Sequence, residues 1–134
     1  MPTLDLCTEE EVANLVYSFY DKVREDALLG PFFNAHVKNW DSHLLKMVDF
    51  WSSALRGTAR FRGTPMPTHA ALPGVSASMF QHWLQLFRET TATLGNSPMQ
   101  ARANLLAQRI AESLWYGYQL HRQPVQIPQG IDCE

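Results

Sequence analysis

The sequence has little of what several classes of protein require. Its two cysteines, Cys7 and Cys133, stand near opposite ends and neither belongs to a CxxC pair, so we expect free thiols and no cysteine-based zinc or redox site. It contains no run of about 18 apolar residues, the length that a membrane-spanning helix needs. The first residues also lack the basic and then apolar segments of a signal peptide. These absences lead us to expect a cytoplasmic protein.

Clustered charge and metal-binding motifs are equally sparse. The formal net charge is −2 and lysine and arginine form no run, which argues against nucleic acid as a partner. The five histidines belong to no HExxH pattern, Glu-x-x-His pair or His/Cys cluster, so we expect no zinc or di-iron site built from side chains alone. A Gly-rich phosphate loop and a Gly-x-Ser-x-Gly motif are absent too.

Aromatic side chains, in contrast, are abundant, with seven Phe, four Trp and four Tyr. A chain of 134 residues, 46% of them hydrophobic, is long enough to bury a substantial core. Aromatic rings in this number can fill that core or line an apolar ligand cavity. We expect a single domain over residues 1–134, with a core at about 8–121 and a tail at 122–134.

Apolar residues recur at steps of three and four along most of the chain, which predicts helices rather than strands. Thr8 and Glu11 form a capping box before the first helix, and Gly57 closes the second. The stretch 31–34 is too short and too closely flanked by turn residues for more than one helical turn. The sequence therefore predicts an all-α fold with four longer helices, at about 9–26, from Asp41 or Ser42 to 55, from Ser76 or Ser78 to just before Gly95, and from an N-cap at Ser97 to about 121.

One histidine, His69, stands on a short segment between two prolines. Pro67 precedes it by two residues and Pro73 follows it by four, so barely one helical turn fits between them. A stiff platform of this kind between longer helices is how a protein would hold an axial ligand to a haem iron. An ordinary loop histidine is the alternative, and the rest of the chain has to decide between the two.

Six motifs occur in order along the chain: Phe19-Tyr20, Gly30-Pro31-Phe32-Phe33-Asn34, Trp40-Asp41-Ser42-His43, Phe50-Trp51, His69-Ala70-Ala71-Leu72-Pro73 and Trp83-Leu84-Gln85-Leu86-Phe87. Each is weak alone, but their order and spacing over about residues 8–121 resemble those of the truncated haemoglobins. The Gly-Gly hinges of groups I and II are missing, which favours group III. The resemblance implies a truncated globin fold, a two-over-two helical sandwich around one haem b.

The resemblance also implies roles on both sides of the haem. His69 matches the proximal iron ligand, whose second ring nitrogen would donate to a backbone carbonyl or water. Tyr20 and Trp83 match distal residues that can donate hydrogen bonds to bound dioxygen, with core packing as the other interpretation. His43 matches the distal histidine, which could contact the ligand, act as a gate or cap the haem edge. Met47, one turn later, would pack over the iron or simply in the core.

The remaining pocket candidates are apolar contacts and basic residues. Phe33, Phe50, Leu72 and Phe87 are candidates for contact with the porphyrin, and an ordinary core position is the default for each. Arg60 and Arg62 are the nearest basic residues before the His69 turn, and they could bind the haem propionates. Solvated loop arginines are the alternative for these two.

These residues predict a function for the pocket. Two donors aimed at bound O2 would slow its release, because a hydrogen bond to a charged group contributes about 1.5–3 kcal/mol. Slow release favours redox chemistry on O2, NO or peroxide over oxygen transport, with NO dioxygenase-like or peroxidase-like turnover that needs an external reductase. The diatomic ligands expected are O2, NO and CO. A ligand sensor or binding module without turnover is the alternative, and a helical bundle without a cofactor is the third interpretation.

Overall fold

The computed structural model describes residues 3–61 and 75–122 of the chain. Within these ranges all regular structure is α-helical, as the sequence predicts. The five helices of this described part are α1 (Glu9–Glu25), α2 (Leu29–His36), α3 (Trp40–Arg56), α5 (Ala77–Thr91) and α6 (Ser97–Arg122).

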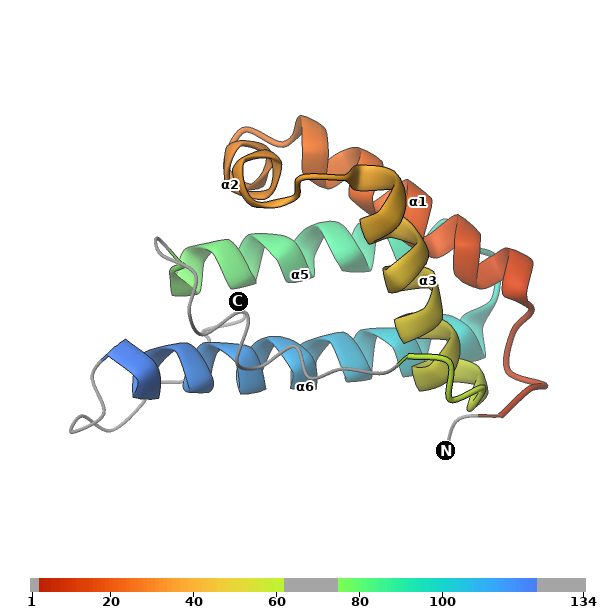
Figure 1. The fold of residues 1–134 in the computed structure, drawn as a ribbon. Helices are drawn as coiled ribbons and strands as arrows, with labels where there is room; N and C mark the ends of the chain where they lie inside the picture. Colours follow the sequence, from red (N-terminus) through yellow and green to blue (C-terminus); the bar gives the residue numbers. More distant parts are fainter. Residues whose placement is uncertain (1–2, 62–74, 123–134) are drawn as a thin grey trace.

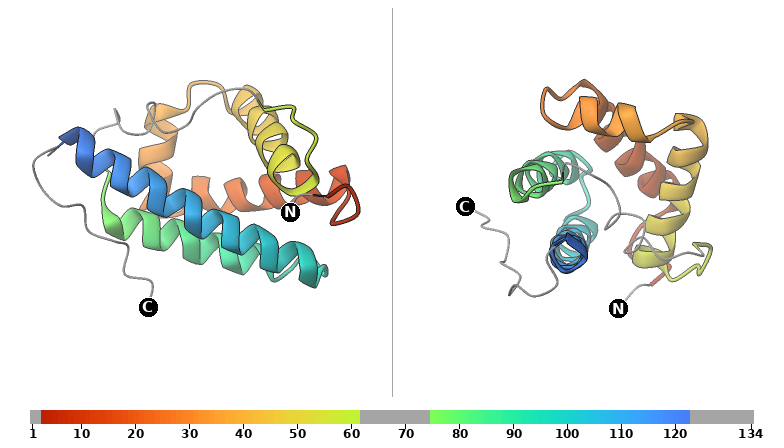
Figure 2. Two further views of the ribbon diagram at one scale, coloured as in Figure 1. Left: turned by 90° about the horizontal axis from the view of Figure 1, so that it is seen from below. Right: turned by 60° about the vertical axis from the view of Figure 1, so that its left-hand side comes forward.

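The helices form two packed pairs (Figure 1). Helices α5 and α6 lie side by side and run in opposite directions, joined by the turn at residues 92–96 (Figure 2). Helices α1 and α3 make the second pair, with α1 packed against α5 and α3 against α6. The arrangement is the two-over-two sandwich that the resemblance implies, with the short helix α2 attached to α1 and α5 at one end.

Helix α1 has the capping box and the buried apolar stripe that the sequence predicts. The Thr8 hydroxyl accepts a hydrogen bond from the Glu11 amide at 3.0 Å, and the Thr8 amide donates to the Glu11 carboxylate at 2.9 Å. This capping box satisfies two amides that the first turn of a helix leaves without intrahelical partners. The apolar stripe of the helix is buried, and its members are Val12, Leu15, Val16, Phe19, Tyr20 and Val23.

Helix α2 corrects the prediction of at most one turn at residues 31–34. It spans eight residues, and the Asp26 side chain binds the amides at its start. One carboxylate oxygen of Asp26 accepts hydrogen bonds from the amides of Leu28 and Leu29, each at 2.9 Å. Pro31 then falls in the first turn, where a missing N–H breaks no intrahelical hydrogen bond. Gly30 lies against the end of α1, where a Cβ atom would come within 2.7 Å of the Arg24 carbonyl oxygen.

The other helix ends agree with the sequence at some positions and differ at others. Helix α5 has its N-cap at Ser76, the earlier of the two predicted starts, and α3 ends at Gly57 with a positive φ of 74°. Helix α3 begins earlier than predicted, since Asn39 rather than Asp41 or Ser42 caps it, with its side-chain oxygen 3.1 Å from the Ser42 amide. Likewise Asn96 rather than Ser97 accepts the first-turn amide of α6, from Met99 at 3.1 Å.

Three further features concern the whole described part of the chain. None of its helices is long and apolar enough to cross a membrane. Its His, Cys, Asp and Glu side chains nowhere gather in a group of three that could hold a metal ion. Cys7 is a buried free thiol, as expected, whereas Cys133 lies outside the described residues.

Candidate functional site

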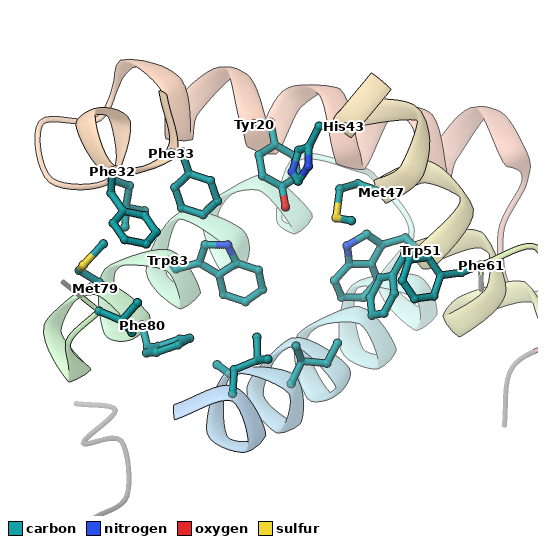
Figure 3. A pocket seen from close by; sticks show the side chains of 16 residues that line it. Tyr20, Phe32, Phe33, His43, Met47, Trp51, Phe61, Met79, Phe80 and Trp83 are labelled. Atoms are coloured by element: carbon teal, nitrogen blue, oxygen red, sulfur yellow. The ribbon is translucent and has the colours of Figure 1, made fainter. Parts of the chain in front are cut away.

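A cavity lies between the two helix pairs, and α2 closes one end of it (Figure 3). The space between its walls measures about 960 Å³ when the open mouth is included. The lining side chains are almost all apolar or aromatic: Tyr20, Leu29, Phe32, Phe33, His43, Met47, Phe50, Trp51, Phe61, Val75, Met79, Phe80, Trp83, Ile110, Ala111 and Leu114.

Few polar atoms face this apolar space. Among the lining residues that the structure describes, only Tyr20, His43, Trp51 and Trp83 carry oxygen or nitrogen in their side chains, and none is an Asp, Glu, Lys or Arg. The phenol and the two indoles can donate hydrogen bonds, and the indoles cannot accept any. The walls therefore suit a flat apolar group together with a small, electron-rich ligand.

Tyr20 extends from the buried face of α1, and Figure 3 shows its hydroxyl pointing into the cavity. The side chain is only 5% exposed. Its ring packs edge-on against Phe19 at 5.0 Å and His43 at 5.4 Å between centroids. Burial raises the pKa of the Tyr20 phenol well above its usual range, so the hydroxyl keeps its proton and stays a donor at any ordinary pH.

Trp83 extends from α5 into the same space, opposite α3 (Figure 3). Its indole packs edge-to-face with the Phe19 ring, at 5.3 Å between centroids and with the two planes 89° apart. Its face stacks on Phe87 at 5.5 Å with an angle of 16° between the planes. Phe87 itself is 1% exposed and is not among the lining residues. The sequence proposed Phe87 as a contact of the cofactor, but the structure places it behind the cavity wall.

The residues predicted from α3 share one face of that helix. His43, Met47 and Phe50 follow each other at steps of four and three, and all three line the cavity. His43 stands near the start of α3, with its ring edge-on to Trp40 at 5.6 Å. Phe33 from α2 also lines the cavity, with its ring edge-on to that of Tyr20 at 6.1 Å between centroids. These side chains, all proposed from the sequence, therefore share the cavity with Tyr20.

Phe61 and Arg60 come shortly after α3, and of these two residues Phe61 lines the cavity and Arg60 does not. The Phe61 amide donates to the Ser53 hydroxyl at 2.9 Å, which ties this residue to α3 and holds its ring against Phe50. Arg60 lies 2.8 Å from a Glu9 carboxylate oxygen and 3.2 Å from one of Asp49. The arginine that the sequence proposed for propionate binding therefore already has two carboxylate partners.

Three of the proposed site residues lie outside the residues that the structure describes. They are His69, the expected proximal ligand, Leu72 and Arg62. Their roles stay predictions from the sequence.

The cavity also includes residues that the sequence reasoning did not assign to it. Met79 and Phe80 precede Trp83 by one helical turn, and Ile110 and Leu114 face them from α6. Their spacing of three and four residues is a usable signal, because it puts them on the cavity face of each helix. Phe61 has no such signal, since it follows the end of α3 and its position depends on the contact with Ser53.

Comparisons with known proteins agree with this geometry. Residues 5–112 match the family model described as bacterial-like globin. The group 3 truncated hemoglobin ctb of Campylobacter jejuni is 34% identical over 118 residues, which cover 81% of this chain and 93% of that protein. The crystal structure of a group III truncated hemoglobin from Campylobacter jejuni superposes with a TM-score of 0.78 at 29% identity, over 93% of this chain and 99% of that one.

Proposed function

Because this chain belongs to the bacterial-like globin family, and within it to the group III truncated haemoglobins, we propose that its cavity holds one haem b. Membership of the family implies that ligands bind at a haem, and globins bind diatomic gases in this way. The observation that carries the proposal is the apolar cavity into which the buried Tyr20 hydroxyl and the Trp83 indole project.

The described walls fit such a group. Phe33, Met47 and Phe50 offer apolar surface on the side of α2 and α3, and Leu72 and the proximal ligand His69 would complete the pocket. When bound, haem supplies an iron that binds diatomic gases. For the propionates we propose Arg62, and Arg60 would join it only by exchanging Glu9 or Asp49 for a propionate.

Tyr20 and Trp83 would act on the ligand as donors. Both present an O–H or N–H from a wall whose other described side chains, His43 and Trp51 excepted, carry neither oxygen nor nitrogen. In such surroundings a hydrogen bond to a polarised ligand is strong. Losing one hydrogen bond to a charged acceptor costs about 1.5–3 kcal/mol, which corresponds to roughly a ten- to hundredfold faster release. The effects of the two donors need not add, because they serve one ligand.

Because the two donors would slow the release of bound O2, we infer that the protein does redox chemistry on O2, NO or peroxide rather than carrying O2. A carrier has to release its ligand readily, whereas two donors oppose release and also help to polarise an O–O bond. Turnover needs an external electron donor, for which the candidate is a separate reductase.

The rate of O2 release from the reduced protein, measured by stopped-flow absorption, tests the role of the donors. Tyr20→Phe and Trp83→Phe should each release O2 roughly ten to a hundred times faster than the unchanged protein. Tyr17→Phe and Trp115→Phe are the controls, because Tyr17 is 41% exposed on α1 and Trp115 does not line the cavity. Release rates that are unchanged in both cavity variants would contradict the proposal.

A further inference from the structure

Phe87 lies between the indole rings of Trp83 and Trp51. Its centroid is 5.5 Å from that of Trp83 with the planes 16° apart, and 5.0 Å from that of Trp51 with the planes 27° apart. Phe87 belongs to α5, one helical turn after Trp83, while Trp51 comes from α3 in the other helix pair. The stack therefore crosses from one pair to the other through the core.

The two outer rings of the stack line the cavity, and the middle ring does not. Figure 3 shows the indole nitrogens of Trp83 and Trp51 on the ring edges that lie toward the Tyr20 hydroxyl. An indole has two side-chain torsions, and a rotation about either would turn its N–H away from this space. A flat ring against the buried face of each indole opposes that rotation.

Phe19 closes the stack from the side of α1. Its ring meets Trp83 edge-on at 5.3 Å and Phe87 edge-on at 5.2 Å, with angles of 89° and 78°. Both Phe19 and Phe87 are 1% exposed, so each is enclosed on all sides by neighbouring side chains. Trp83 is consequently held by Phe87, which stacks on it, and by Phe19, which packs edge-to-face with it.

We propose that Phe87 is a positioning residue, whose ring fixes the planes of Trp83 and Trp51 and keeps the Trp83 N–H directed into the cavity. The part of this inference that concerns the ligand rests on the proposed function, while the part that concerns the two indole planes does not. Phe87 touches no ligand in this account and acts through Trp83.

The substitution Phe87→Met removes the flat ring and keeps an apolar side chain of similar length, which packs adaptably. Phe87→Leu is the second variant, should the first disturb folding. Leu84→Met is the matched control, because Leu84 is equally buried on α5 and carries no ring that could stack on an indole. All variants are prepared as full chains.

The first measurement follows the four indole N–H signals by proton–nitrogen NMR of the reduced, CO-saturated protein, assigned with Trp→Phe variants. In Phe87→Met the signals of Trp83 and Trp51 should shift and broaden, while those of Trp40 and Trp115 stay in place. Leu84→Met should leave all four nearly unchanged. Signals of Trp83 and Trp51 that do not move, or four signals that move alike, would overturn the inference.

The second measurement is O2 release. Phe87→Met should release O2 roughly three to ten times faster than the unchanged protein. On a logarithmic scale this is about half the effect expected for Trp83→Phe. If the indole signals shift but release stays as in the unchanged protein, Phe87 does not position the donor and the inference fails. If the unchanged protein takes up no haem, the proposed function fails, while the same comparison of indole signals, made on the haem-free chains, still decides whether Phe87 fixes the two rings.

Discussion

Asp26 is the C-cap residue of α1, and its side chain contacts both α2 and α5. Replacing it by asparagine should therefore measurably weaken the fold. One of its oxygens accepts the Leu28 and Leu29 amides at the entry to α2, and the other lies 2.5 Å from His82 Nε2 on α5. Its side chain is 15% exposed. Asparagine keeps one accepting oxygen but loses the charge, so some of these hydrogen bonds disappear and the rest become weaker.

The expected loss at pH 7 is about 1.5–3 kcal/mol in the free energy of unfolding, the size of a hydrogen bond to a charged group. Asp21→Asn is the control. It removes the same charge, but from a side chain that is exposed on α1. Its effect should stay within about 0.5 kcal/mol. Urea unfolding followed by circular dichroism measures both variants against the unchanged protein.

The stabilising effect of Asp26 should also depend on pH. Burial acts to raise the pKa of Asp26, but the hydrogen bonds from His82, Leu29 and Leu28 outweigh it, so the pKa is lowered. A carboxylate with a lowered folded-state pKa stabilises the fold at pH values above its unfolded-state pKa, near 3.9. The stability difference between the unchanged protein and Asp26→Asn should shrink as the pH falls below about 4. A difference that is absent at pH 7, or the same at pH 7 and pH 3.5, would refute this reasoning.

Two further substitutions test how the helices next to the cavity are positioned. Gly30→Ala should lower the free energy of unfolding by about 1–3 kcal/mol, since its Cβ would meet the Arg24 carbonyl oxygen at 2.7 Å; thermal unfolding measures this, and an unchanged midpoint would show that α2 can move away freely. Asn39→Ala should cost about 0.5–2 kcal/mol through the lost cap of α3, whereas Asn39→Asp should keep most of the stability; equal losses in the two variants would contradict the capping role.

The sequence is informative about the longer helices because their determinants are local. The capping box of Thr8 and Glu11, the Ser76 cap and the left-handed Gly57 each need only a few neighbouring residues. Helix α2 is different. It depends on the Asp26 carboxylate and on the close approach of Gly30 to α1, and no periodic pattern reports either contact.

The same distinction holds for the cavity. Tyr20, Trp83, His43 and Met47 come together from three helices as the motif order suggests. Helical spacing alone does not tell whether Phe87 or Trp83, one turn apart on α5, faces the open space, because both lie on the inward side of the helix.

Arg60 shows the limit of reasoning from sequence distance. It stands nine residues before His69 in the sequence, which suggested the propionates as its partners. The structure instead pairs it with Glu9, which is 51 residues away along the chain. Only the packing of α1 against α3 brings these two side chains together.

Titration of haem into the haem-free full chain tests the central claim most directly. We expect a Soret absorption band that saturates at one haem per chain, with quenching of tryptophan fluorescence because Trp51 and Trp83 line the cavity. His69→Ala should lose the native coordination spectrum, while His36→Ala should keep it, since His36 is exposed at the end of α2. A chain that binds no haem, takes it up without a one-to-one end point, or keeps its native coordination spectrum in His69→Ala would contradict this account.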